Sequence, residues 1–215
     1  MTNGTVSLEQ LTAWLARFEA LVTENKAYLT ELDSAIGDAD HGANMARGMT
    51  AVMEKIGANP AAGAVDELFK SVGMTLVTSV GGASGPLYGT FFLRFGMSGG
   101  PGKSLDASAL GAALRAGLEG VVARGKAEVG DKTMFDAMSP AIDAYVAAVA
   151  EGGDAATAAS TAFEAAQVGR DATRELVARK GRASYLGERS AGHLDPGATS
   201  TTLLFEALAT ALTSG

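Results

Sequence analysis

Apolar residues recur at helical spacing along most of this 215-residue chain. The clearest stretch follows Ser7, where apolar side chains stand three, four or seven positions apart: Leu8, Leu11, Leu15, Phe18, Val22 and Leu29. This spacing places them on one face of a helix. A serine followed three positions later by Gln10 is typical of a capped helix start. The pattern predicts one long amphipathic helix that ends near Leu32.

Glycine, proline and polar clusters divide the rest of the chain into further helical stretches. We place these at 42–57, 62–80, 85–98, 106–124, 131–150, 153–180 and 198–213. Pro86 and Pro140 each follow a serine closely and suit a helix start, although Pro140 could instead kink a continuous helix. No strand-length alternation and no internal repeat stands out. The sequence therefore predicts an all-α bundle or helical barrel of about eight helices.

Composition supports the same fold class. The chain has 42 alanines and 28 glycines, and only 6% of its residues are aromatic. Small residues suit closely packed helices with glycine-marked ends, whereas strands favour β-branched and aromatic residues. The length is that of one ordinary domain, which we expect to span residues 1–215.

Charge and residue usage exclude several functions. With 17 basic and 24 acidic residues the net charge is −7, which argues against a nucleic-acid partner. No cysteine is present, so disulfides and thiolate chemistry are excluded, and two histidines are too few for a histidine-rich zinc site. No apolar run reaches the roughly 18–20 residues of a membrane span, and the polar start does not resemble a signal peptide. We expect a soluble, cytoplasmic protein without a membrane partner.

The first segment with candidate chemistry is DSAIGDADHGANMARG, which begins at Asp33. Its three carboxylates, Asp33, Asp38 and Asp40, would repel one another unless a hard divalent cation lay among them. The twelfth position counted from Asp38 is Met49, which excludes a calcium EF-hand and favours magnesium. A helix that begins just downstream would add N–H groups suited to phosphate. The alternative is that these aspartates only cap and decorate a turn.

A second segment, SVGGASGPLYGTFF, places glycines on both sides of Ser84. Such glycines let backbone N–H groups approach a phosphate closely, and the Ser84 hydroxyl could add a donor. The segment matches neither the Walker nor the dinucleotide pattern. Taken alone, such a segment is more often an ordinary glycine-rich turn with a capping serine.

A third long loop precedes the last helix and reads GRASYLGERSAGHLDPG from Gly181. Arg182 and Arg189 suit phosphate recognition, and its last three residues form a tight turn that opens a helix. In the shorter GDKTMFDAM segment, Lys132 could meet a phosphate and Met134 could pack on a purine. Such residues are more often a solvated lysine and a core methionine.

Together these segments resemble a known family. GDADHGANMARG, GGASGPLYGTFF, GDKTMFDA and GRASYLGERSAGHLDPGATST are similar to the nucleotide-binding L subunit of bacterial dihydroxyacetone kinase, over about Leu8 to Leu212. The resemblance implies an eight-helix antiparallel barrel that holds ADP or ATP at one end through two magnesium ions. It implies that a separate subunit holds dihydroxyacetone and that a phosphocarrier protein subunit supplies the phosphoryl group.

Carried over by position, the resemblance also implies the site residues. The magnesium ligands would be Asp33, Asp38 and Asp40. The nucleotide-binding residues would be His41, Gly42, Ala43, Asn44, Ala83, Ser84, Gly125, Met134, Arg182, Asp195, Pro196 and Gly197. The resemblance identifies no catalytic side chain and suggests a homodimer.

Three other functions remain open from the sequence. The chain could be an ATP-dependent kinase subunit for dihydroxyacetone or a related short sugar such as erythrulose, in which the nucleotide exchanges. It could be a nucleotide- or metal-sensing module without turnover. It could also be a helical scaffold whose aspartate and glycine loops are only turns.

Overall fold

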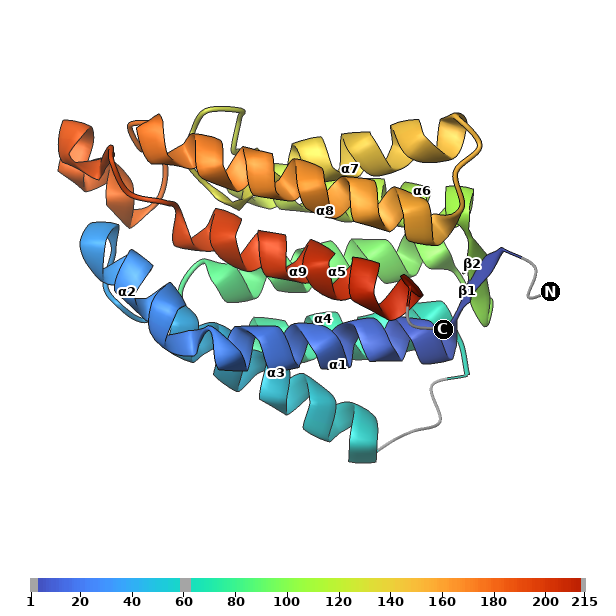
Figure 1. The fold of residues 1–215 in the computed structure, drawn as a ribbon. Helices are drawn as coiled ribbons and strands as arrows, with labels where there is room; N and C mark the ends of the chain where they lie inside the picture. The colour runs from blue at the N-terminus through green and yellow to red at the C-terminus, as the bar shows by residue number, and fades with distance from the viewer. Residues whose placement is uncertain (1–3, 59–62, 214–215) are drawn as a thin grey trace.

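The structure is a computed structural model that describes residues 4–58 and 63–213. Its helices confirm the all-α prediction (Figure 1). The α-helices are α1 (Leu8–Glu24), α2 (Lys26–Ile36), α3 (His41–Ala58), α4 (Val65–Ser79), α5 (Ser84–Gly99), α6 (Ala107–Gly125), α7 (Met134–Ala150), α8 (Ala155–Ala172) and α9 (Pro196–Thr213). Two 3₁₀ segments, η1 (Thr173–Glu175) and η2 (Arg182–Ser190), lie between α8 and α9.

Eight of these helices form a closed ring. Each packs on the next in the order α1, α3, α4, α5, α6, α7, α8 and α9, and α9 returns to α1. The Trp14 indole N–H of α1 donates to the Leu204 carbonyl of α9 at 2.9 Å and joins the first helix to the last. Helix α2 lies beyond one end of α1 and covers the start of α3 (Figure 1). The predicted helical barrel is therefore present, with α2 as an addition.

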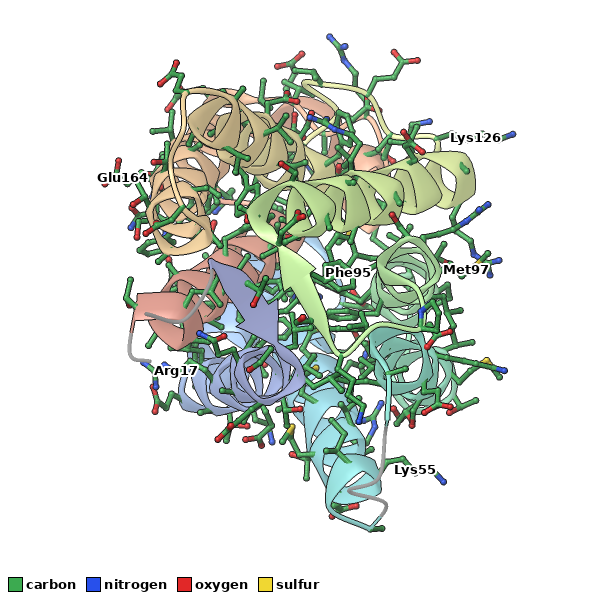
Figure 2. The ribbon with its side chains drawn as sticks, turned by 90° about the vertical axis from the view of Figure 1, so that its right-hand side faces the viewer. Arg17, Lys55, Phe95, Met97, Lys126 and Glu164 are labelled. Carbon is green, nitrogen blue, oxygen red and sulfur yellow. The ribbon has the colours of Figure 1, made fainter. Side chains whose placement is uncertain are left out.

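The barrel interior is filled by a single large apolar cluster. Trp14 packs its ring against Phe69, Phe92 and Phe95, with centroids 5.5 to 5.9 Å apart. Figure 2 shows Phe95 between the helices, while charged residues such as Lys55 and Glu164 lie on the outside. Burial of these large side chains is the main stabilising contribution to the fold.

Several predicted boundaries were wrong, each for a local reason. The predicted first helix is divided at Asn25, whose side-chain amide donates to the Leu21 carbonyl and caps α1. The helix expected over 153–180 ends at Ala172, and the chain continues as 3₁₀ structure. Pro140 lies inside α7, which runs through it without a break. The helix expected over 62–80 begins at Val65, and residue 62 lies outside the described residues.

The structure also contains a small sheet that the sequence pattern did not indicate. Strands β1 (Thr5–Ser7) and β2 (Ser104–Asp106) pair antiparallel, with Val6 opposite Leu105. Three residues are too few to give a recognisable alternation of apolar and polar positions. The sheet lies at the end of the barrel opposite α2 (Figure 1).

The direction of the helices decides where chemistry can occur. Because neighbours in the ring run antiparallel, α3, α5, α7 and α9 all begin at the end covered by α2. The first N–H groups of a helix have no partner within the helix itself, and the helix start carries a partial positive charge. The fold therefore concentrates positive potential at one end of an acidic protein. Among the described helices, none combines the length and the apolar character that crossing a membrane requires.

Candidate functional site

A cavity of about 510 Å³ opens at the end where the four helices begin. The first residues of α3, α5, α7 and α9 line it, namely His41, Ser84, Met134 and Pro196. The four segments singled out in the sequence, far apart along the chain, thus contribute to one site. Converging helix N-termini favour an anionic ligand such as a phosphate.

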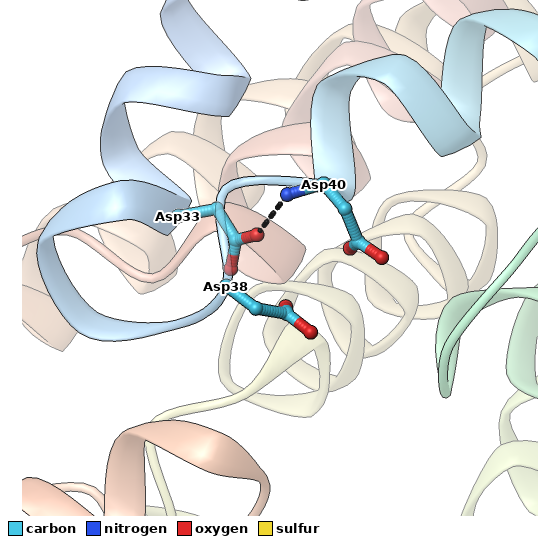
Figure 3. Close-up of side chains that lie close together, drawn as sticks. All are labelled: Asp33, Asp38 and Asp40. Carbon is cyan, nitrogen blue, oxygen red and sulfur yellow. Dashed lines mark hydrogen bonds between the residues drawn. The ribbon is translucent and has the colours of Figure 1, made fainter.

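The three aspartates predicted to bind metal lie together at this cavity (Figure 3). One oxygen from each of Asp33, Asp38 and Asp40 lies within 4.8 Å of the others. Asp33 comes from the last turns of α2 and is buried, whereas the other two come from the α2–α3 turn and are exposed. Oxygen donors grouped in this way suit a hard divalent cation. The geometry is compatible with magnesium.

Backbone hydrogen bonds fix this cluster. The Asp33 carboxylate accepts the N–H groups of Asp40 at 2.8 Å and of His41 at 3.1 Å. Ala39, which lies between Asp38 and Asp40, adopts a left-handed φ of 61° and turns the chain back toward α2. The turn is therefore held by Oδ2 of Asp33, and Oδ1 of the same carboxylate can contact a cation.

Asp38 also forms an ion pair across the cavity. Its carboxylate lies 2.7 Å from the Arg182 Nε, which comes from η2. Arg182 was predicted to bind nucleotide and Asp38 to bind metal, and here they neutralise each other. The pair is exposed and therefore weak, so a charged ligand can separate it at little cost.

A chain of buried hydrogen bonds supports His41 and Ser84. The His41 ring contacts the Ser84 hydroxyl through Nδ1 at 3.1 Å and the Ser200 hydroxyl through Nε2 at 2.9 Å. Ser200 in turn contacts the Tyr88 hydroxyl at 2.8 Å, and Tyr88 contacts Thr201 at 3.0 Å. Burial lowers the pKa of His41 despite the two nearby aspartates, and raises the pKa of Tyr88 to about 12. Helices α3, α5 and α9 are thereby joined beneath the cavity.

Asp195 is a buried carboxyl at the start of α9. It accepts the Ala198 N–H at 2.7 Å, which caps the helix, and its own N–H donates to the Thr173 hydroxyl at 3.0 Å. Burial raises its pKa to about 7, with Asp136 and Asp33 adding to the shift. The capping bond and Lys132 oppose this rise.

Lys132 differs from both alternatives that the sequence left open. It is only 1% exposed and is therefore not solvated. Its ammonium donates to three backbone carbonyls, those of Thr173, Leu176 and His193, at 2.8, 3.1 and 2.6 Å. Because a lysine has three N–H donors, none remains for a phosphate.

Most of the predicted site residues line the cavity. These are Asp33, Asp38, Asp40, His41, Ala83, Ser84, Gly125, Met134, Arg182, Asp195, Pro196 and Gly197. Gly42, Ala43 and Asn44 are not among the lining residues. Gly42 faces the backbone of α2, where a Cβ would collide with the Lys26 carbonyl. Asn44 lies against Gly81 and accepts a hydrogen bond from Arg47. Its side chain therefore packs on the glycine-rich segment that precedes Ser84.

Sequence reasoning missed other lining residues. Arg124 and Lys180 bring positive charge to the cavity, and Leu87, Val121 and Ala127 add apolar side chains to its lining. Arg124 lies in the last turn of α6, where a basic residue is ordinary. No sequence signal marked the apolar group, because its members also fit the core face of a helix.

Comparison with known proteins identifies the family of this chain. Residues 35–210 match the family model of the DAK2 domain, and the chain belongs to that family. The chain is 44% identical over 208 residues to the "PEP-dependent dihydroxyacetone kinase, ADP-binding subunit DhaL" of Escherichia coli, covering 96% of this chain and 98% of that protein. It is 47% identical over 203 residues to the PTS-dependent counterpart of Lactococcus lactis, covering 94% and 97%. The expected relationship to these subunits is confirmed.

A solved structure supports the same assignment. The dihydroxyacetone kinase of C. freundii in complex with AMP-PNP and Mg²⁺ superposes with a TM-score of 0.70 at 27% identity. The match covers 93% of this chain but 33% of that longer enzyme. The present chain therefore corresponds to about one third of the C. freundii enzyme.

Proposed function

We propose that this chain is the ADP- and ATP-binding subunit of a phosphoenolpyruvate-dependent dihydroxyacetone kinase. It would take a phosphoryl group from a phosphocarrier protein subunit onto ADP and pass it to dihydroxyacetone held by a separate subunit. One observation carries the proposal: a carboxylate cluster and four helix N-termini meet in a single cavity. Two relatives that it matches over almost their full length are named as ADP-binding subunits of dihydroxyacetone kinases.

Asp33, Asp38 and Asp40 would hold magnesium, and we propose two ions. Their fit rests on the structure, because three carboxylates lie within 4.8 Å of one another and Arg182 pairs with only one of them. When bound, magnesium neutralises phosphate charge and so favours phosphoryl transfer. The cluster explains how a protein of net charge −7 can receive a polyphosphate.

The protein's own groups would then orient the phosphates. The first-turn N–H groups of α5, which begins with Ser84 at the cavity, would serve as preorganised donors, whereas the His41 N–H of α3 already bonds to Asp33. Arg182 would leave Asp38 when the carboxylate engages metal and would turn its guanidinium to a phosphate oxygen. Ser84, held by His41, adds a polar group at the same wall. These residues position the transferring group and need not form a covalent intermediate.

The apolar part of the cavity would receive the base. Met134, Leu87 and Val121 line this region and present no charge. A flat aromatic ring buries apolar area against such a wall. The cavity thus provides a polar end for phosphates and an apolar end for adenine.

The proposal is tested by calorimetric titration of ADP with and without magnesium. Asp38→Asn should greatly reduce magnesium-dependent ADP binding while the helical circular dichroism spectrum is retained. A matched control is Asp143→Asn, because Asp143 also pairs with an arginine, Arg115, at 2.6 Å but lies nine residues along α7 from Met134. Equal ADP affinity in the two variants would refute the proposed metal site.

A second measurement separates two modes of nucleotide use. Protein purified in magnesium buffer is denatured, and any released nucleotide is identified by chromatography and mass. Near-stoichiometric ADP would support a retained coenzyme recharged by the phosphocarrier protein. An empty protein that takes up ATP reversibly would favour an exchanging ATP-dependent kinase subunit. We also propose a homodimer, which analytical ultracentrifugation would test.

A further inference from the structure

Lys132 is a buried charge to which the proposed chemistry assigns no role. It follows α6 in the loop that leads to α7, and it has a left-handed φ of 62°. Its three carbonyl partners belong to a different part of the chain, the connection between α8 and α9. A strained backbone and a buried cation are both unfavourable, so their combination requires compensation.

The partners of Lys132 mark the two ends of one loop. Thr173 and Leu176 lie where the chain leaves the barrel after α8, and His193 lies where it returns before α9. Between them runs the loop 177–192, which projects beyond the barrel at the left of Figure 1. This loop carries Lys180 and Arg182 of the cavity wall. The ammonium therefore links the two chain segments that enter and leave the loop.

Besides Lys132, the loop is attached through the Arg179 N–H bond to the Asp131 carbonyl, the exposed Arg182–Asp38 ion pair and a few apolar contacts. Its apolar contacts form a small separate cluster in which Ala178, Ala183 and Leu186 pack on Ile36 of α2. Such a cluster buries far less apolar area than the barrel core. Segments with few buried apolar contacts open readily. The polar attachment at the base should therefore control how well the loop is ordered.

The loop in which Lys132 lies is itself held firmly. The buried Asp136 carboxylate accepts the N–H groups of Gly130 at 2.6 Å and of Thr133 at 2.8 Å. The Asp131 carbonyl accepts the Arg179 N–H of the opposite loop at 3.0 Å. Lys132 thus extends from a fixed point on the barrel.

We propose that Lys132 is a positioning residue, whose ammonium fastens both ends of the loop 177–192 and so places Arg182 and the Asp195 turn opposite the aspartate cluster. This inference rests on the proposed function only in taking the cavity as the nucleotide site. Lys132 is among the residues that line the cavity, but its three N–H donors are used by carbonyls of the loop, so it acts on the ligand through the loop. Its removal should loosen the loop and weaken nucleotide binding together.

The test compares Lys132→Met with Lys126→Met. Methionine retains the apolar stem of the lysine but removes its donors. Lys126 is a matched control, because it is a lysine with a left-handed φ of 51° in the same connection but is exposed. Hydrogen exchange is followed at the amides of Ala178 and Gly192, which donate to Ser190 Oγ and the Arg174 carbonyl. ADP affinity is measured by calorimetry in the presence of magnesium.

Lys132→Met should speed exchange at these amides by about tenfold or more and weaken ADP binding by a similar factor, because local opening competes with binding. Helical circular dichroism should be retained, and Lys126→Met should behave as wild type. Unchanged exchange would overturn the proposal. Faster exchange with unchanged ADP affinity would also overturn it, since the residue would then be structural only. Failure of the wild type to bind ADP would refute the proposed function and leave the exchange result valid.

A measurement on the unsubstituted protein covers the case in which Lys132→Met does not fold. Nitrogen-15 spectra of the seven lysine ammonium groups should contain one signal in slow exchange with water. Lys132→Arg, which keeps the charge and several donors, should remove that signal and retain more loop protection than any donor-free variant. Rapid exchange of all seven signals would contradict the proposal.

Discussion

Replacement of Asp40 by asparagine should stabilise the metal-free protein and at the same time abolish most of its stabilisation by magnesium and ADP. Asp40 is exposed, precedes α3 directly, and lies within 4.8 Å of carboxylate oxygens of Asp33 and Asp38. Asparagine has nearly the same shape and caps a helix equally well. The substitution therefore removes a charge and little else.

The magnitude follows from these separations. Two unit charges about 4.8 Å apart in a water-like medium repel by about 0.9 kcal/mol. Asp40 has two such neighbours, but Arg182 pairs with Asp38 and offsets its charge, so neutralisation of Asp40 relieves about 1 kcal/mol, chiefly from Asp33. The loss of a negative charge at a helix start costs about 0.3–1 kcal/mol. The expected net gain in the free energy of unfolding is up to about 0.6 kcal/mol in EDTA.

Urea unfolding followed by circular dichroism measures this difference in EDTA and in magnesium with ADP. Asp154→Asn is the matched control, because Asp154 is also an exposed aspartate directly before a helix and accepts the Thr157 N–H at 2.8 Å. That control should lose a little stability and keep the full response to magnesium and ADP. The reasoning fails if Asp40→Asn destabilises the protein in EDTA, or if its response to magnesium and ADP equals that of wild type.

Three other substitutions test the cavity and its supports. Tyr88→Phe removes one hydroxyl from the buried hydrogen-bond network that includes Ser200, and should lower the free energy of unfolding in urea by about 1–2 kcal/mol and weaken ADP binding. Unchanged stability would contradict the role of this network. Asp195 has its pKa raised to about 7 in the folded protein, so its contribution to stability is complete below pH 4 and is lost as the pH rises through 7, by up to about 4 kcal/mol. Asp195→Asn should therefore flatten the fall in stability over this range in EDTA, and a parallel pH profile would refute the assignment. Gly85→Ala places a Cβ against the backbone carbonyl at the end of α4 and should cost about 1–3 kcal/mol, whereas Gly57→Ala, in open space on α3, should be neutral or stabilising when both are compared by thermal unfolding.

The ring of helices also explains how a protein of net negative charge can present positive groups at its cavity. The protein is acidic as a whole, yet the cavity receives four helix starts together with Arg124, Lys180 and Arg182. The aspartates at the same place would repel a phosphate, and a divalent cation bound among them would offset this repulsion. Local arrangement therefore outweighs net charge in determining which ligand fits.

Much of this protein was determined by local features of the sequence. Apolar spacing fixed most helices because a buried face must repeat with the helical period. The aspartate cluster was readable because Asp33, at the end of α2, lies within eight residues of Asp38 and Asp40 in the following turn, and a turn brings near neighbours together whatever the remainder of the fold does. The glycine-rich segment around Ser84 and the turn at Asp195 before α9 were recognisable for the same reason.

Tertiary structure alone decided the rest. Strands of three residues left no pattern, and the break at Asn25 depended on a side-chain hydrogen bond that competes with a continuous helix. Lys132 reads as a surface or phosphate-binding lysine, but its three partners lie 41 to 61 residues away. Arg124 and the apolar wall enter the cavity only because the ring closes. Contacts between distant segments follow from packing, and the local periodicity of a sequence does not record them.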